Sequence, residues 1–96
     1  MASQTARVPT ANAGKYIQQL CKHWSHKLEV DFDAEHGTVK FPDAVAEMKA
    51  TPDALEVVLT AADEATVDRF KPVISSHLDR FAFREAPLSF DWQPVG

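Results

Sequence analysis

The chain has 96 residues and a formal net charge of −4, and 45% of its residues are hydrophobic. A chain of this length has room for one hydrophobic core, so we expect a single domain over residues 1–96, with residues 1–4 disordered. The acidic balance argues against nucleic-acid binding, which needs clustered lysine and arginine. No apolar run approaches the roughly 20 residues that span a bilayer, and no secretory pattern opens the chain, so we expect a cytoplasmic protein.

The N-terminal third predicts a short strand and then a helix. Residues 5–8 read as a strand, and Pro9 confines it to a sheet edge or a strand end. Thr10 or Asn12 is a suitable N-cap for the helix, which we expect to give way to a strand near Lys27. Apolar residues recur there at helical spacing and predict a buried stripe. The stripe consists of Ile17, Leu20, Cys21, Trp24 and Leu28.

The middle of the chain alternates with a period of two, which is typical of strands with one covered side and one solvent-facing side. Residues 28–33 and 38–41 predict a hairpin, whose turn places Gly37 where a positive φ is expected. Residues 44–50 and 55–60 continue the alternation on either side of a turn that contains Pro52. Together these segments predict an antiparallel meander.

The C-terminal third predicts a second helix and a final strand. Asp63 is its expected N-cap, and Pro72 should kink the helix or split it near residues 69–71, because proline removes a backbone hydrogen bond. Residues 88–92 alternate again and predict the last strand. The core stripe of this helix consists of Val67, Phe70, Ile74, His77, Leu78 and Phe81.

The predicted order of elements is β-α-β-β-β-α-β. Both helices must cover the same apolar face of the sheet, because the charged alternate face of the strands cannot be buried. We therefore predict an α+β fold, a two-layer sandwich in which an antiparallel sheet carries two helices on one face.

Residues 20–27 hold an unusual density of chemically active side chains, including the only cysteine. His23 and His26 are three positions apart and can converge on a helix, and His77 could join them, so these three are weak candidates for a zinc or iron site. Cys21 and His23 diverge by about 200° on a helix and cannot readily share a metal. The alternative, which we favour, is that no metal or cofactor binds and Cys21 is a small buried hydrophobe.

Basic residues of the two helices form a candidate site for an anionic ligand, if the helices lie side by side. Arginine holds carboxylate or phosphate in a bidentate fork, and lysine adds a point charge. The candidate residues are Lys22, His23, His26, Lys27, His77, Arg80 and Arg84. In the alternative interpretation the lysines are simply solvated, and the arginines favour the end of the second helix or pair with Asp79 and Glu85.

Nucleophilic catalysis finds little support, and we assign no catalytic residue. Cys21 lies on the buried stripe, where burial raises a thiol pKa. Ser75 and Ser76 precede His77, but adjacent residues on one helix point apart and cannot form a relay. His77 itself lies on the apolar stripe, where a histidine is more often a hydrogen-bonded core residue than a catalyst.

Three segments resemble a bacterial domain family of unknown function, and the resemblance covers residues 5–92. They are the run KYIQQLCKH in the first helix with His26-Lys27 after it, Phe41-Pro42, and the run SHLDRFAFRE in the second helix. Some members of the family are joined to or neighbour siderophore-interacting, flavin-dependent ferric reductases. The resemblance therefore implies a link to iron acquisition, with such a reductase as a candidate partner, and implies no activity. Pro72 departs from the uninterrupted helix expected of the family.

These residues favour a small non-enzymatic binding or accessory module for an anionic ligand, in iron or siderophore handling. One alternative is a small enzyme with His23 or His77 as general base and an arginine as substrate anchor, which requires an enclosed pocket. Another is a protein-interaction domain that uses the exposed sheet face, through residues such as Lys40, Glu47 or Val58. The distance between His23 and His77 decides whether the helix site exists.

Overall fold

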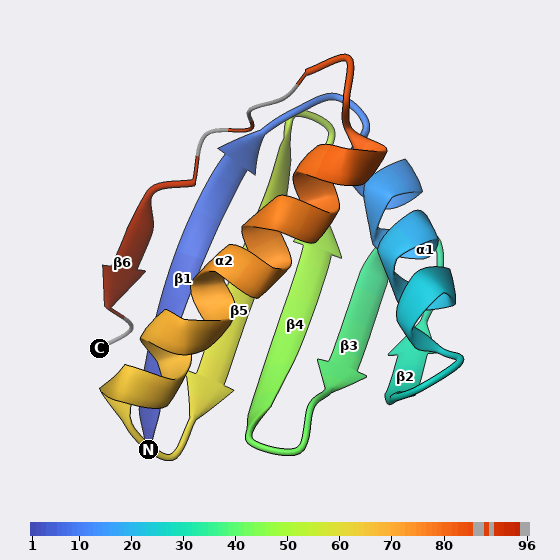
Figure 1. The fold of residues 1–96 in the computed structure, drawn as a ribbon. Coiled ribbons are helices and arrows are strands. Elements are labelled where there is room, and N and C mark those ends of the chain that lie inside the picture. Colours follow the sequence, from blue (N-terminus) through green and yellow to red (C-terminus); the bar gives the residue numbers. More distant parts are fainter. Residues whose placement is uncertain (86–87, 89, 95–96) are drawn as a thin grey trace.

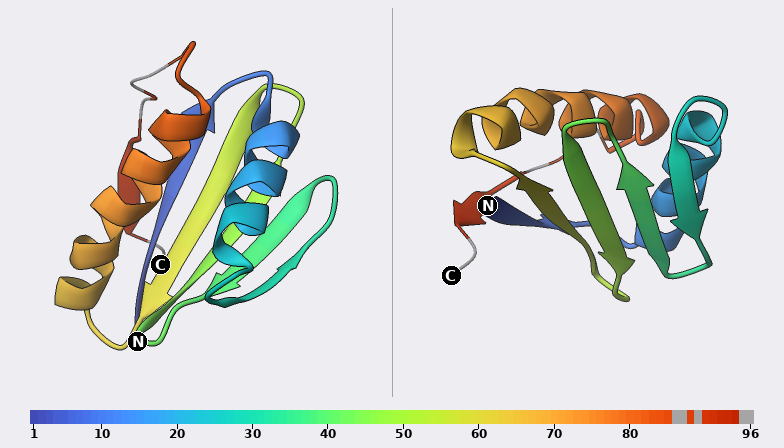
Figure 2. Two further views of the ribbon diagram at one scale, coloured as in Figure 1. Left: turned by 45° about the vertical axis from the view of Figure 1, so that its right-hand side comes forward. Right: turned by 90° about the horizontal axis from the view of Figure 1, so that it is seen from below.

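A computed structural model describes residues 1–85, 88 and 90–94 as one six-stranded sheet with two helices (Figure 1). The helices lie on the same face of the sheet (Figure 2). In the sheet order β2-β3-β4-β5-β1-β6, every neighbouring pair is antiparallel, which confirms the α+β sandwich. The elements are β1 (Ala2–Pro9), α1 (Ala13–Trp24), β2 (Glu29–Phe32), β3 (His36–Lys40), β4 (Ala44–Ala50), β5 (Ala54–Ala61), α2 (Glu64–Phe81) and β6 (Trp92–Pro94).

Four strands lie between the helices, where the predicted order has three. The predicted hairpin supplies β2 and β3, and each of the two following alternating segments forms a strand of its own, β4 and β5. Mainly, α1 packs over β2, β3 and β4, while α2 packs over β5 and β1. Within residues 1–85, 88 and 90–94, no helix is long and apolar enough to cross a membrane.

Strand β1 begins at Ala2, three residues earlier than predicted, so the structure does not show the disorder expected of residues 1–4. These residues are ordered because β1 lies between β5 and β6 in the sheet and is not an edge strand. In the pairing with β5, Ala2 lies opposite Ala61 and Gln4 lies opposite Leu59. Gln4 is also buried. Pro9 lies at the end of the strand, as predicted.

Helix α1 ends at Trp24, earlier than predicted. The Ser25 hydroxyl donates a hydrogen bond to the Lys22 carbonyl at 2.8 Å, which satisfies one of the carbonyls that a helix end leaves unpaired. His26 and Lys27 consequently lie in the turn after the helix. The predicted stripe is buried as far as Trp24. The buried residues of α1 are Ala13, Tyr16, Ile17, Leu20, Cys21 and Trp24.

The positive φ expected at Gly37 is wrong, because this glycine lies within β3 and faces α1. The turn before it is instead built by Asp33, whose carboxylate accepts hydrogen bonds from the backbone N–H groups of Glu35 and His36. A Cβ added at Gly37 would lie 2.8 Å from both Cys21 Sγ and Ile17 Cγ2. Glycine is needed at this position because α1 packs so close to β3 that a larger side chain would not fit.

Helix α2 begins as predicted, since the Asp63 carboxylate accepts a hydrogen bond from the Thr66 N–H at 2.8 Å. The predicted split is wrong, because the helix runs through Pro72 without a break. Pro72 and Asp68 are exposed, so water can satisfy the Asp68 carbonyl that proline leaves unpaired. Buried Val67 and Ile74 anchor the helix on either side.

The last strand is shorter than predicted, because β6 covers only Trp92–Pro94. Leu88 is buried and precedes the strand, and its N–H donates a hydrogen bond to the Asp79 carboxylate at 2.9 Å. Residue 89 of the predicted strand lies outside the described residues. Leu88 is therefore held to α2 through the Asp79 side chain.

Candidate functional site

The junction of α1 and α2 brings His23 and His77 together, with 5.6 Å between their ring centroids. His23 is exposed in the last turn of α1, and His77 is half-buried in α2. The Trp24 ring lies 4.9 Å from the His77 ring, and the Phe81 ring lies 5.8 Å from the His23 ring. Two aromatic side chains thus support a pair of imidazoles at the protein surface.

A backbone contact fixes the tautomer of His77. Its Nδ1 lies 2.7 Å from the Val73 carbonyl oxygen. A carbonyl oxygen only accepts hydrogen bonds, so Nδ1 carries a proton and donates it. This leaves Nε2 without a hydrogen-bond partner among residues 1–85, 88 and 90–94. A histidine held in this way can present Nε2 to a ligand.

A hollow of about 130 Å³ lies beside this histidine pair and is lined by Ser76, His77 and Arg80. Arg80 is exposed and makes no ion pair with any described residue. The neighbouring carboxylate, Asp79, accepts a hydrogen bond from the Leu88 N–H, so it is directed elsewhere. Pockets for whole small molecules typically measure about 300–1,000 Å³, so this hollow suits a single carboxylate or phosphate group.

The structure divides the other predicted residues among different surfaces. Lys22 lines a hollow on another side of α1, together with Gln18 and Ala34. Arg84 lines a third hollow, between the beginning of α1 and the end of α2. His26 and Lys27 are exposed in the turn after α1. Of the seven candidates, the structure therefore places His23 against His77, and places Arg80 at a hollow that His77 also lines.

The three weak metal candidates do not form a ligand set. Among the residues that the structure describes, no three His, Cys, Asp or Glu side chains are placed to hold a metal ion. His26 is separated from the His23–His77 pair because α1 ends before it. Burial raises the pKa of the Cys21 thiol to about 11, so Cys21 is a protonated core residue at neutral pH.

Glu85, which follows α2, forms a hydrogen-bonded cluster that the sequence analysis did not predict. Its carboxylate accepts hydrogen bonds from the Thr10 hydroxyl at 2.9 and 3.0 Å, from the Asn12 amide at 3.3 Å, and from the Tyr16 hydroxyl. The hydrogen bond from Tyr16, and then that from Thr10, hold the pKa of Glu85 below its usual value. Burial, followed by the same contact, raises the pKa of Tyr16. The cluster joins residues that are far apart in the chain.

Replacing Glu85 with glutamine should make the free energy of unfolding less dependent on pH in the acidic range. Because the folded-state pKa of Glu85 is lowered, its contribution is present above the unfolded value of about 4.3 and is lost as the pH falls through the lowered value. At pH 7 we expect Glu85→Gln to be less stable by roughly 1 kcal/mol, since the site is exposed. Urea unfolding between pH 3 and pH 7 measures both effects. The matched control is Glu47→Gln, and equal acid sensitivity of all three proteins would contradict the assignment.

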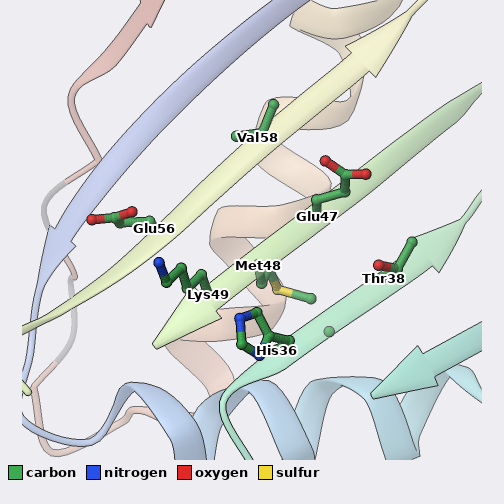
Figure 3. A pocket seen from close by; sticks show the side chains of 8 residues that line it. His36, Thr38, Glu47, Met48, Lys49, Glu56 and Val58 are labelled. Atoms are coloured by element: carbon green, nitrogen blue, oxygen red, sulfur yellow. The ribbon is translucent and has the colours of Figure 1, made fainter. Parts of the chain in front are cut away.

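The outer face of the sheet carries a further hollow of about 310 Å³ (Figure 3). His36, Lys49 and Glu56 stand in one row across β3, β4 and β5, and Glu47 and Val58 stand in the next. Cationic and acidic side chains alternate there, so the hollow has no clear preference for anions. This is the surface that the protein-interaction alternative would use.

The comparisons with known proteins establish the family. The family described as "Uncharacterized protein conserved in bacteria (DUF2218)" matches residues 5–93. The chain belongs to this family. A member of known structure, PA4090 from Pseudomonas aeruginosa, solved by NMR, is 37% identical over 98% of this chain and 97% of that chain, with a TM-score of 0.83. No curated protein matches the chain.

Membership of this uncharacterized family confirms the resemblance seen in the sequence and agrees with the observed fold. Neither the family description nor the name of the Pseudomonas protein states an activity, a ligand or a partner. The iron and siderophore link therefore stays a prediction.

Proposed function

We propose that this protein is a small non-enzymatic module that binds an anionic ligand at the junction of α1 and α2. The observation that carries the proposal is the 5.6 Å separation of the His23 and His77 rings, beside a hollow that Arg80 also lines. An anion placed there would accept hydrogen bonds from the Arg80 guanidinium and from the ring N–H of His23, and such charge-assisted bonds are about twice as strong as neutral ones.

The distribution of charge over the helices supports this proposal. Helix α1 contains no acidic residue, and of the three acidic residues of α2 only Asp79 lies beside Arg80, where it accepts the hydrogen bond from the Leu88 N–H. Several cations on this side of the described structure form no ion pair, whereas Arg7 and Arg69 elsewhere do. A local positive field on a protein of net charge −4 favours an anionic partner. The unpaired cations on and after the helices are Lys15, Lys22, Lys27, Arg80 and Arg84, while Lys49 is unpaired on the outer sheet face.

The geometry favours binding over general-base catalysis. His77 is oriented by the Val73 backbone carbonyl, whereas a catalytic histidine is commonly oriented by a carboxylate that stabilises its charged form. The hollow beside it is small and lies at the surface, where the other two lining residues, Ser76 and Arg80, are exposed. A bound anion would therefore remain in contact with water, which suits reversible holding.

The size of the hollow limits what part of a ligand it can hold. A volume of about 130 Å³ seats one carboxylate or phosphate group, while the remainder of a larger molecule would lie along the helices. Together with the family resemblance, this leads us to propose that the ligand is an organic acid or siderophore handled beside a siderophore-interacting reductase. Titration with citrate and with a ferric siderophore extends the test to these ligands.

Calorimetric titration of the protein with inorganic phosphate tests the site. We expect saturable binding that weakens about tenfold in His23→Ala and in Arg80→Gln, because each removes a charge-assisted hydrogen bond. Lys49→Gln, on the opposite face, removes the same charge and serves as the matched control, with affinity unchanged. Equal affinity of wild type, His23→Ala and Arg80→Gln would overturn the proposal.

A further inference from the structure

The hollow that Arg84 lines lies between the beginning of α1 and the end of α2, on the seam between the two helices. It measures about 380 Å³, close to the lower range of pockets that hold whole small molecules. Phe81 lines this hollow, and its ring also lies 5.8 Å from that of His23. Phe81 therefore lies between this hollow and His23 of the proposed anion site. The hollow is lined chiefly by Lys15, Tyr16, Gln19, Phe81, Phe83 and Arg84.

Two aromatic side chains at this hollow, Phe81 and Phe83, are at least partly exposed and can contact a ligand. Phe83 is 72% exposed and follows α2, so its ring faces solvent and is not part of the core. Phe81, two residues earlier, is half-buried and lines the same hollow. The Arg84 guanidinium lies 5.8 Å from the Phe83 ring centroid. An arginine beside an exposed ring offers a planar ligand both an apolar surface and a positive charge.

The charges around the hollow favour an anion in spite of Glu85. Lys15 and Arg84 form no ion pair within the described part of the chain, so both are available to a ligand. The Glu85 carboxylate also lines the hollow, but Thr10, Asn12 and Tyr16 donate hydrogen bonds to it. Two cations thus line the hollow with one carboxylate, which already accepts hydrogen bonds from three side chains.

We propose that this seam binds an aromatic carboxylate, whose ring lies against Phe81 and Phe83 while its carboxylate is held by Lys15 and Arg84. The inference rests on the proposed function, because it extends the anion site along the same helix junction and names the class of ligand. It also assigns a role to Arg84, which the structure separates from His23 and Arg80. A ligand with a second acidic group could reach both sites past Phe81.

The test compares four small anions by ligand-observed NMR and calorimetry: benzoate, cyclohexanecarboxylate, acetate and inorganic phosphate. We expect benzoate to bind about threefold to tenfold more tightly than acetate, since an aromatic contact adds a modest stacking gain. Cyclohexanecarboxylate has a similar size but no aromatic face, so it should bind more weakly than benzoate. Phe83→Ala and Arg84→Gln should abolish the preference. Both side chains are exposed, so these variants should fold normally.

The possible outcomes separate this inference from the proposed function. If benzoate binds no better than acetate or cyclohexanecarboxylate, the aromatic site is overturned, even where phosphate binding still depends on Arg80. If the benzoate preference depends on Phe83 and Arg84 while phosphate ignores His23 and Arg80, the aromatic site is supported and the histidine site is overturned. Loss of benzoate preference in Lys49→Gln, on the far face, would show a general charge effect and contradict the assignment.

Discussion

Replacing Trp24 with alanine should lower the free energy of unfolding by about 3 to 5 kcal/mol, the usual result of emptying a buried aromatic site. Trp24 is only 7% exposed, and its ring packs edge-on against Phe41 at 5.0 Å and against His77 at 4.9 Å. The change removes contacts to the hydrophobic core and to His77 at once. Because small domains are stable by about 5–15 kcal/mol, this loss is a large share of the total.

Chemical unfolding in urea measures this loss, and Phe83→Ala is the matched control. Phe83 is exposed, so its truncation should change stability by less than about 0.5 kcal/mol. Trp24→Phe should retain much of the packing and fall between the two variants. A loss below about 1 kcal/mol for Trp24→Ala would contradict the packing described for this residue.

Replacing Gly37 with alanine should lower the free energy of unfolding by about 1 to 3 kcal/mol, although alanine is normally the better residue inside a strand. The added Cβ would lie 2.8 Å from Cys21 Sγ and from Ile17 Cγ2, and both residues are fully buried. Helix α1 must then move away from β3, or its side chains must adopt strained rotamers. Gly37→Leu should prevent folding of this layer.

Thermal and urea unfolding of Gly37→Ala, alone and combined with Cys21→Ala, measures the effect. The double variant should recover part of the lost stability, because removing the sulfur makes room for the new methyl group. If Gly37→Ala is as stable as wild type, the close approach of helix and strand is contradicted.

The architecture of this domain could be predicted from periodicity alone. The helical stripe through Ile17 and Trp24 and the two-residue alternation of the strands together determine which face of each element is apolar. What periodicity does not contain is how closely the layers approach. Periodicity therefore suggests that Gly37 is a turn residue, whereas the structure shows that a glycine is needed because α1 lies so close to β3.

The candidate site was predictable in part. The dense segment around His23 and the position of His77 on α2 indicated the pair that the structure places side by side. The other members depended on local events that the residue spacing does not reveal. Ser25 caps the end of α1, so His26 lies outside the helix. The alternative interpretation allowed an arginine to pair with Glu85, but in the described structure that carboxylate accepts hydrogen bonds from the hydroxyls of two buried residues in a distant segment, Thr10 and Tyr16.

An NMR titration of the 96-residue protein with inorganic phosphate, observed at the imidazole and guanidinium nitrogens, tests the anion site most directly. We expect saturable shifts at His23, His77 and Arg80 with a single midpoint, and no comparable shift at His36 on the outer sheet face. Signals that stay unchanged at His23 and His77, or shifts spread equally over all the histidines, would contradict an anion site at the helix junction.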